Sequence, residues 1–140
     1  MEKIIIKALG IAEKNQRARD LEGIWGNLTK SEEVEDPIET VKKMIAENLG
    51  TEISRDELAA AVYLNPDYLT RRFKQETGLS LSDYIIEKRV ALAKRLLLKT
   101  ELSIVEISEK AGFSYSSYFV RLFRKKTGIT PQQYREQSKE

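Results

Sequence analysis

Hydroxyl and guanidinium side chains recur at a helical spacing within residues 115–127. At about 100° per residue, Ser117, Arg121 and Arg124 lie on one side of a helix, and Ser116 and Val120 flank them. An arginine can form two parallel hydrogen bonds to the edge of a guanine, and a serine hydroxyl can bond to a base or a phosphate. A helix face with these groups is suited to contact a nucleic acid, although an isolated helix of this kind is more often a solvated amphipathic surface.

The residues around this helix indicate how it would be held. Phe119, Leu122 and Phe123 give it an apolar rear face on which a neighbouring element can pack. A short helix is predicted before it, beginning at the capping pair Ser103 and Glu106. The remaining signals are a turn glycine, an N-cap, a C-terminal glycine and the capped start of a last helix: Gly112, Ser114, Gly128, Thr130, Pro131 and Gln133. This order predicts a helix-turn-helix, whose second helix enters the major groove of DNA.

The same arrangement occurs twice in the chain. Five residues recur 50 positions later, where Phe73, Thr77, Gly78, Ser80 and Tyr84 become Phe123, Thr127, Gly128, Thr130 and Tyr134. The first helices align at an offset of 49, so the second copy has one extra residue in its turn. Tyr63 takes the place of the turn glycine in the first copy, and Asn65 caps the helix that follows. The repeat predicts two helix-turn-helix units.

The outward face of the first copy differs from that of the second. Its positions, in the order of Ser117, Val120, Arg121 and Arg124, are Asp67, Thr70, Arg71 and Lys74. Asp67 has two interpretations. It could accept a hydrogen bond from a cytosine amino group, or it could complement the partial positive charge at the helix N-terminus. The second interpretation is favoured, because an acid in the first turn mainly serves the helix dipole.

Residues 81–99 are predicted to form one long helix between the two copies. It has two apolar seams, one of Ile86, Val90, Ala93 and Leu97 and one of Ile85, Leu92 and Leu96. A helix that is apolar on two sides packs on two sides, so it is expected to be a shared spine. Its length of about 28 Å is comparable with the ~34 Å between successive major grooves on one side of DNA. Lys88, Lys94 and Arg95 are expected to be solvated or, alternatively, to contact phosphates.

Composition limits the chemistry available to the 140 residues. The sequence has no cysteine and no histidine, which removes thiolate chemistry and the commonest general base and metal ligand. No cofactor or metal site is expected, and an enzyme is the least favoured class, since a glycine-rich phosphate loop and clustered carboxylates are also missing. No apolar run approaches the ~20 residues that span a bilayer, so a cytoplasmic protein without membrane contact is expected. The net charge of +2 arises in residues 37–140, because residues 1–36 are net acidic.

Residues 1–36 are predicted to form an N-terminal helix, over 1–28, and an acidic linker. Ile4, Ile11, Ala18 and Trp25 recur every seven residues, whereas three glycines weaken the helix. Three interpretations stay open: a linker or dimerising helix that would make a homodimer, a helix packed on its own domain, or a frayed remnant. Residues 37–140 are then a tandem helix-turn-helix domain, with 37–80 as first subdomain, 81–99 as spine helix and 100–140 as second subdomain.

Residues 38–138 resemble the DNA-binding domain of AraC/XylS-type transcription regulators. The strings that carry the resemblance are IVEISEKAGFSYSSYFVRLFRKKTGITPQQYR, ELAAAVYLNPDYLTRRFKQETGLSLSDYI and KRVALAKRLLLKT. The resemblance implies an all-α domain of seven helices, in which helices 66–77 and 115–127 read adjacent major grooves. Residues 1–28 resemble the last receiver helix and linker of AraC-type response regulators. The chain would then be the output fragment of a two-component protein, and a free-standing small regulator is the alternative.

The resemblance also implies roles for single residues. Thr70, Arg71, Ser117 and Arg121 resemble base-reading positions, and Lys74 and Arg124 resemble phosphate contacts. The family often has a larger polar residue where this sequence has Asp67 and Val120, although a valine can still touch a thymine methyl group. The expected function is sequence-specific binding of double-stranded DNA that regulates transcription, as an activator contacting RNA polymerase. The competing hypothesis is a helical protein-interaction module, which would have no salt-linked affinity for duplex DNA.

Overall fold

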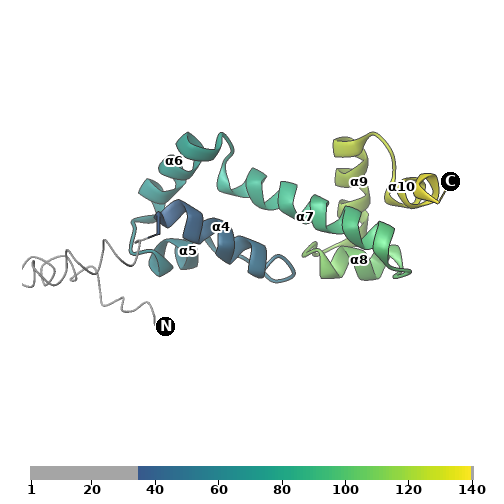
Figure 1. Ribbon diagram of the computed structural model, residues 1–140, viewed down its shortest axis with the longest axis horizontal. Helices are drawn as coiled ribbons and strands as arrows, with labels where there is room; N and C mark the ends of the chain where they lie inside the picture. Colours follow the sequence, from purple (N-terminus) through teal and green to yellow (C-terminus); the bar gives the residue numbers. More distant parts are fainter. Residues whose placement is uncertain (1–34, 140) are drawn as a thin grey trace, which may run out of the picture.

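The computed structural model describes residues 35–139, and this part of the chain contains seven helices and no strand (Figure 1). The helices, labelled as in Figure 1, are α4 (Pro37–Glu47), α5 (Arg55–Ala61), α6 (Pro66–Thr77), α7 (Leu81–Lys99), α8 (Ile104–Lys110), α9 (Ser116–Thr127) and α10 (Pro131–Ser138). The all-α fold expected from the sequence is confirmed for these residues. The helix predicted over residues 1–28 lies outside them. None of the described helices is long and apolar enough to cross a membrane.

Most of the helices begin at the caps that the sequence predicts. Reciprocal capping boxes are present at Ser103 with Glu106 and at Thr130 with Gln133. The side chains of Asp36 and Asn65 accept hydrogen bonds from the first turns of α4 and α6. These caps satisfy backbone N–H groups that have no partner within the helix, and so they define where each helix starts.

The prediction that Ser114 caps the helix that follows it is wrong. Helix α9 begins at Ser116, and its N-cap, Tyr115, makes no side-chain capping bond. The reason lies in the preceding turn, where the Phe113 N–H donates to the Ser108 carbonyl at 3.0 Å. The matching bond of the first copy runs from Leu64 to the Ala59 carbonyl at 2.9 Å, and the N-cap Asn65 follows Leu64 directly. Ser114 is therefore the extra residue of the second copy, and it stands before the cap position.

The helices enclose two hydrophobic clusters. The first contains buried residues of α4, α5 and α6, with Leu81 of α7, and the second contains buried residues of α7, α8 and α9. The role of α7 as a shared spine is confirmed, because it contributes to both. The predicted use of its two seams is wrong, however, since Ile86, Leu92 and Leu96 all pack on the second cluster. The division runs along α7, whose first turns serve the first cluster and whose remaining turns serve the second.

The two helix-turn-helix units are the same device built twice. The Phe73 and Tyr84 rings meet edge to face at 5.0 Å, and 50 residues later Phe123 and Tyr134 do so at 5.5 Å. The turns agree as well, because Tyr63 and Gly112 both adopt a positive φ, of 59° and 95°. Glycine reaches that conformation without cost, whereas a tyrosine there is strained. The repeat predicted from sequence is thus present in backbone conformation and in packing.

Candidate nucleic-acid interface

Helices α6 and α9 present equivalent faces near the two ends of α7. In Figure 1 they are separated by the length of α7 and run in roughly the same direction, each with its C-terminal end at the top of the view. Each helix buries an apolar side completely, through Leu69 and Phe73 in α6 and Phe119 and Phe123 in α9. Because the rear of each helix is fixed in a core, its front face is held rigidly toward solvent.

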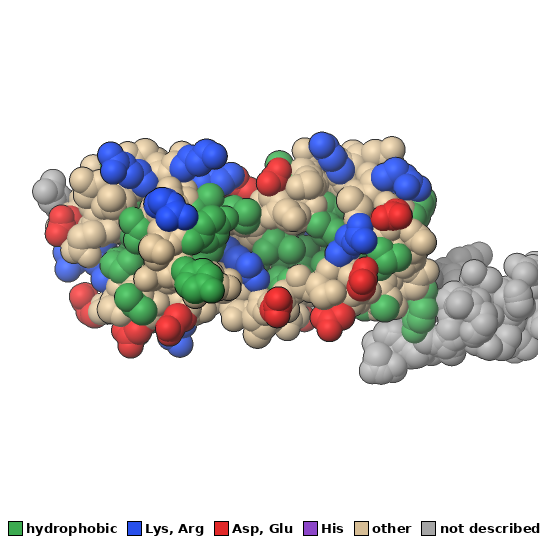
Figure 2. Space-filling view, turned by 180° about the vertical axis from the view of Figure 1, so that it is seen from behind, with side chains coloured by type: hydrophobic (Ala, Val, Ile, Leu, Met, Phe, Trp, Pro, Cys, Tyr) green, Lys and Arg blue, Asp and Glu red, His purple; other side chains and the backbone are tan. Residues whose placement is uncertain are grey.

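None of the side chains predicted to contact DNA is a buried core residue, although Val120 packs against the second hydrophobic cluster. The exposed ones are Asp67, Arg71, Lys74, Ser117, Arg121 and Arg124, and the half-buried ones are Thr70, Ser116 and Val120. Figure 2 shows Lys and Arg side chains gathered along the upper margin of the molecule, over both ends, whereas Asp and Glu lie mostly toward the lower margin. A polyanion approaching α6 and α9 would therefore meet the basic margin first.

The cations of these helices divide into paired and unpaired ones. Arg72 bonds to Glu76 at 2.7 Å and to Asp36 at 3.0 Å, and Lys126 bonds to Glu87 at 2.9 Å. The hydrogen bond that Arg72 donates to Glu76 raises the pKa of Arg72, and the one that Lys126 donates to Glu87 raises the pKa of Lys126. Within residues 35–139, by contrast, the cations without an ion pair on these faces include Arg71, Lys74, Arg121 and Arg124. These four keep their charge available for an external anion.

Two tyrosines that sequence reasoning missed lie beside the outward arginines. The Arg71 guanidinium carbon lies 5.9 Å from the centre of the Tyr68 ring, and that of Arg121 lies 6.0 Å from the centre of the Tyr118 ring. Both rings are about two-fifths exposed, at 43% and 40%. The signal was available in the sequence, because both tyrosines stand three residues before an arginine and 50 residues apart. Each ring offers its negative face to a cation and limits the rotamers of the arginine.

Two of the predicted contact residues already have partners inside the protein. Asp67 accepts a hydrogen bond from Arg55 at 3.2 Å and stands in the first turn of α6. In that turn its charge would complement the helix dipole. The Thr70 hydroxyl donates to the Pro66 carbonyl at 2.9 Å. Its oxygen lone pairs remain able to accept a bond from a base.

Arg135, in the last helix, has a structural role. Arg135 is buried, and its guanidinium donates to the carbonyls of Leu97 and Thr100, both at 3.1 Å. It thereby satisfies carbonyl groups at the C-terminal end of α7 and places a positive charge where the helix dipole is negative. No group of three or more His, Asp, Glu or Cys side chains among the described residues could hold a metal ion.

Comparison with known proteins identifies the family. A helix-turn-helix domain model matches residues 58–137. The chain is 39% identical over 89 residues to the uncharacterized HTH-type transcriptional regulator YtdP of Bacillus subtilis, which is 64% of this chain and 12% of that protein. It therefore spans only a small part of this curated relative, and 35% of YijO of Escherichia coli.

Solved structures of similar size agree over most of the described residues. The C-terminal domain of the two-component response regulator yesN from Fusobacterium nucleatum is 38% identical, with a TM-score of 0.66 over 69% of this chain and 95% of that one. The DNA-binding domain of AdpA, solved in complex with a target DNA, is 30% identical, with a TM-score of 0.69 over 73% and 92%. An AraC-type regulator from Chromobacterium violaceum is 32% identical, with a TM-score of 0.69 over 73% and 91%. With its two helix-turn-helix units joined by one shared helix, the chain belongs to the AraC family of DNA-binding transcription regulators.

Proposed function

We propose that α6 and α9 read two successive major grooves on one side of double-stranded DNA. The observation that carries this proposal is the equivalence of Arg71 and Arg121. Both are exposed on the second helix of a helix-turn-helix, and each lies beside a tyrosine ring. The helix between the two units has 19 residues, or about 28 Å, which is comparable with the ~34 Å repeat of the groove.

The base-reading and phosphate-binding roles are divided among the outward residues. Thr70, Arg71, Ser117 and Arg121 read base edges, with Ser116 and Val120 beside them and Asp67 orienting the start of α6. Lys74 and Arg124 neutralise phosphates toward the C-terminal halves of the two helices. Phosphate contacts then supply most of the affinity, and base contacts supply the discrimination between sequences.

The wider role that we propose is transcription activation through contact with RNA polymerase, in the cytoplasm and without catalysis. The similarity to a response-regulator C-terminal domain supports an output function in a two-component protein. In that arrangement residues 1–36 would link the DNA-binding domain, residues 37–140, to a sensory domain or would dimerise it. The division into subdomains 37–80 and 100–140 around the spine 81–99 belongs to the same proposal.

Selection of bound sites from a random duplex library, followed by anisotropy titrations, tests the DNA-binding proposal. Arg121→Ala is expected to weaken binding to the selected site by about 1–3 kcal/mol and to relax preference at one base pair. Arg95→Ala, which removes an exposed arginine of α7, is the control and should leave the preference at every base pair unchanged. Equal weakening of selected and scrambled DNA by Arg121→Ala would contradict the base-reading role.

The competing function, a helical protein-interaction module, makes an opposite prediction. This function predicts that the protein has no salt-dependent affinity for duplex DNA, and that partner binding survives charge reversal at Arg121 and Arg124. A titration at two salt concentrations therefore separates the two functions. The likeness to a domain solved with its target DNA supports the first.

A further inference from the structure

The first half of the domain, with helices α4 to α6, touches the second half, with helices α8 to α10. At this contact the main chains of two turns meet directly. The turn after α4 approaches the turn between α8 and α9. A Cβ atom added to Gly112 would collide with the carbonyl oxygen of Leu49, and one added to Gly50 would lie 3.0 Å from the Lys110 carbonyl oxygen. Position 112 therefore needs a glycine for two reasons: its positive φ of 95° and this close approach of the main chains.

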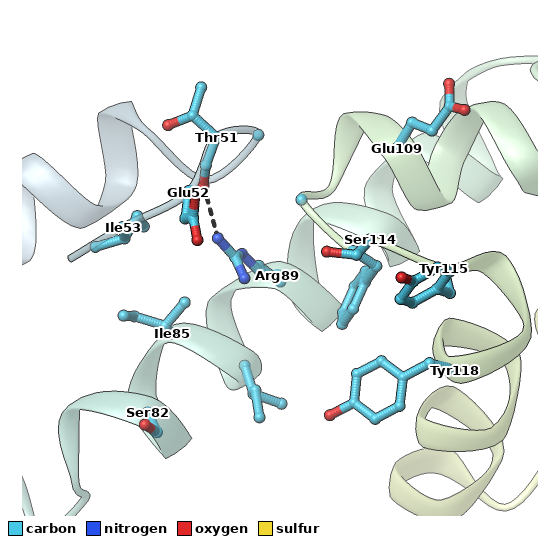
Figure 3. Close-up of a pocket in the computed structure, with 14 residues that line it drawn as sticks. Thr51, Glu52, Ile53, Ser82, Ile85, Arg89, Glu109, Ser114, Tyr115 and Tyr118 are labelled. Carbon is cyan, nitrogen blue, oxygen red and sulfur yellow. Dashed lines mark hydrogen bonds between the residues drawn. The ribbon is translucent and has the colours of Figure 1, made fainter.

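Arg89 completes the same contact from α7. Its Nε donates to the Leu49 carbonyl at 3.1 Å and one Nη donates to the Thr51 carbonyl at 2.8 Å. A Cβ on Gly112 would lie 2.6 Å from that Nε, so the guanidinium also lies against the second turn. Figure 3 shows Arg89 reaching from α7 toward Thr51, with the start of α9 on the other side. Arg89 therefore touches both turns and belongs to the helix that joins them.

This contact spans a cleft of about 820 Å³ that separates the two halves. The cleft is lined from the first half by residues such as Ile53, and from the second by Phe113 and Tyr118. Helices α4 and α5 both pack on α6, α8 and α10 both pack on α9, and the two groups share α7. We call the contact of Arg89 and Gly112 with the turn at Leu49 and Thr51 the brace, because it opposes bending of one half toward the other.

The brace is connected directly to both outward helices. Gly112 precedes the first residue of α9 by four positions, and α4, which leads into the Leu49 turn, packs on α6. The far end of α9 is tied to α7 by the ion pair of Lys126 with Glu87, at 2.9 Å. Helix α9 is thus positioned at its start by the brace and near its end by a charge pair.

We infer that Arg89 and Gly112 are positioning residues that fix the orientation of α6 relative to α9, and through it the spacing between the two DNA segments that the protein accepts. The part of this inference that concerns DNA rests on the proposed function. Neither residue needs to touch DNA. A bend at α7 would displace one recognition helix relative to the groove that the other occupies, and two rigid faces must match successive grooves together.

The orientation can be measured without DNA, by pulsed electron spin resonance between two spin labels. The natural sequence has no cysteine, so Gln75→Cys and Lys125→Cys place one label at the same exposed position of α6 and of α9. The doubly labelled protein with Arg89 and Gly112 intact should give a single narrow distribution of distances between the two labels. Arg89→Ala should broaden or shift it, whereas Arg95→Ala, on the exposed side of the same helix, should not. Circular dichroism confirms that each variant is folded.

The consequence for DNA is tested with selected sites whose two halves are moved apart or together by one base pair. Arg89→Ala should reduce the wild-type preference for the original spacing by about tenfold, the size of effect that one mismatched base pair causes. Gly112→Ala should act in the same direction where it folds. An unchanged distance distribution in Arg89→Ala overturns the inference, and so does a broadened one with an unchanged spacing preference. Failure of the wild-type protein to bind any duplex would overturn the proposed function, while the distance measurement would still test the brace.

Discussion

The guanidinium carbon of Arg121 lies 6.0 Å from the centre of the Tyr118 ring on α9, in a pairing that Arg71 and Tyr68 repeat on α6. An arginine held against an aromatic face loses less side-chain entropy when it binds, because fewer of its rotamers are populated beforehand. The two tyrosines would then improve DNA binding through the arginines that they hold.

Replacing Tyr118 by leucine is expected to weaken binding to a selected DNA site by about 0.5–1 kcal/mol, the value of an exposed cation–π pair. Tyr118→Phe keeps the aromatic face and should bind as the wild type does. The measurement is fluorescence anisotropy, with thermal unfolding as a check because the Phe113 ring lies 6.1 Å away. Equal affinities for the leucine and phenylalanine variants would show that the ring does not position Arg121.

Lys74→Ala should weaken binding to all duplexes alike and reduce the slope of log affinity against log salt by about 1, since one phosphate contact is lost. Arg72→Gln is the matched control on the same helix. Arg72 is already bonded to Glu76 and Asp36, so its removal should change the slope less. Titrations at four salt concentrations measure both slopes, and equal slopes for wild type and Lys74→Ala would contradict the phosphate contact.

Ser108→Ala should stabilise the protein by about 1 kcal/mol, because it removes a buried hydroxyl that lacks a hydrogen bond. Ser108 is 1% exposed, and its Oγ has no partner among the described residues. The equivalent position of the first copy is Ala59, also 1% exposed. Urea unfolding measures the change, and the reverse variant Ala59→Ser should be destabilised. A loss of stability in Ser108→Ala would mean that the hydroxyl has a role in the second core.

Gly128→Ala should destabilise the protein by about 1–2 kcal/mol through backbone strain alone. Gly128 ends α9 with a φ of 92°, and no atom lies within 4 Å of a Cβ built on it. Gly78, at the same place in the first copy, has a φ of 86° and equally open surroundings, so Gly78→Ala should cost a similar amount. Thermal unfolding compares the two, and a neutral effect at both would contradict the strain argument.

The capping box of α8 should make stability depend on pH, whereas that of α10 should not. The hydrogen bonds from Ser103 lower the pKa of Glu106 below its usual range. A lowered pKa in the folded state adds stability above the unfolded pKa, and this contribution is lost as the pH falls through the folded value. Glu106→Gln should therefore be less stable than wild type at neutral pH, with a difference that shrinks as the pH falls below the usual glutamate pKa of about 4.3. A difference independent of pH would assign the box to neutral hydrogen bonds, as in the Thr130 and Gln133 pair.

Local signals in the sequence were sufficient for the elements and the repeat. Caps such as Asn65 and Thr130 act over three residues, so they can be recognised without knowledge of the fold, and the structure has both. The outward face of α9 followed from helical spacing against the buried Phe119 and Phe123. Ser114 misled because serine is a good cap, and only the alignment of the two turns shows that it precedes the cap position.

Features that depend on contacts between distant residues could not be predicted. Arg89 is one of several cations of the 81–99 helix, and nothing in its neighbourhood along the chain distinguishes it from Arg95. Its partners are carbonyl groups 38 and 40 residues away, and any residue type can supply a carbonyl. The division of α7 along its length was missed for the same reason, since the apolar pattern records that a face is buried but not which partner covers it.

The way α7 is shared has a consequence for any attempt to exchange one recognition unit between related regulators. Leu81 belongs to the first core and Leu97 to the second. A junction between two parent sequences at either end of α7 would therefore replace core residues of one unit with those of the other parent. A chimera should instead change parent within the middle turns, after Arg89, so that Arg89 comes from the same parent as the Leu49 and Thr51 carbonyl groups that it binds. The two units therefore share one helix as part of both cores, and neither can be exchanged as a separate module.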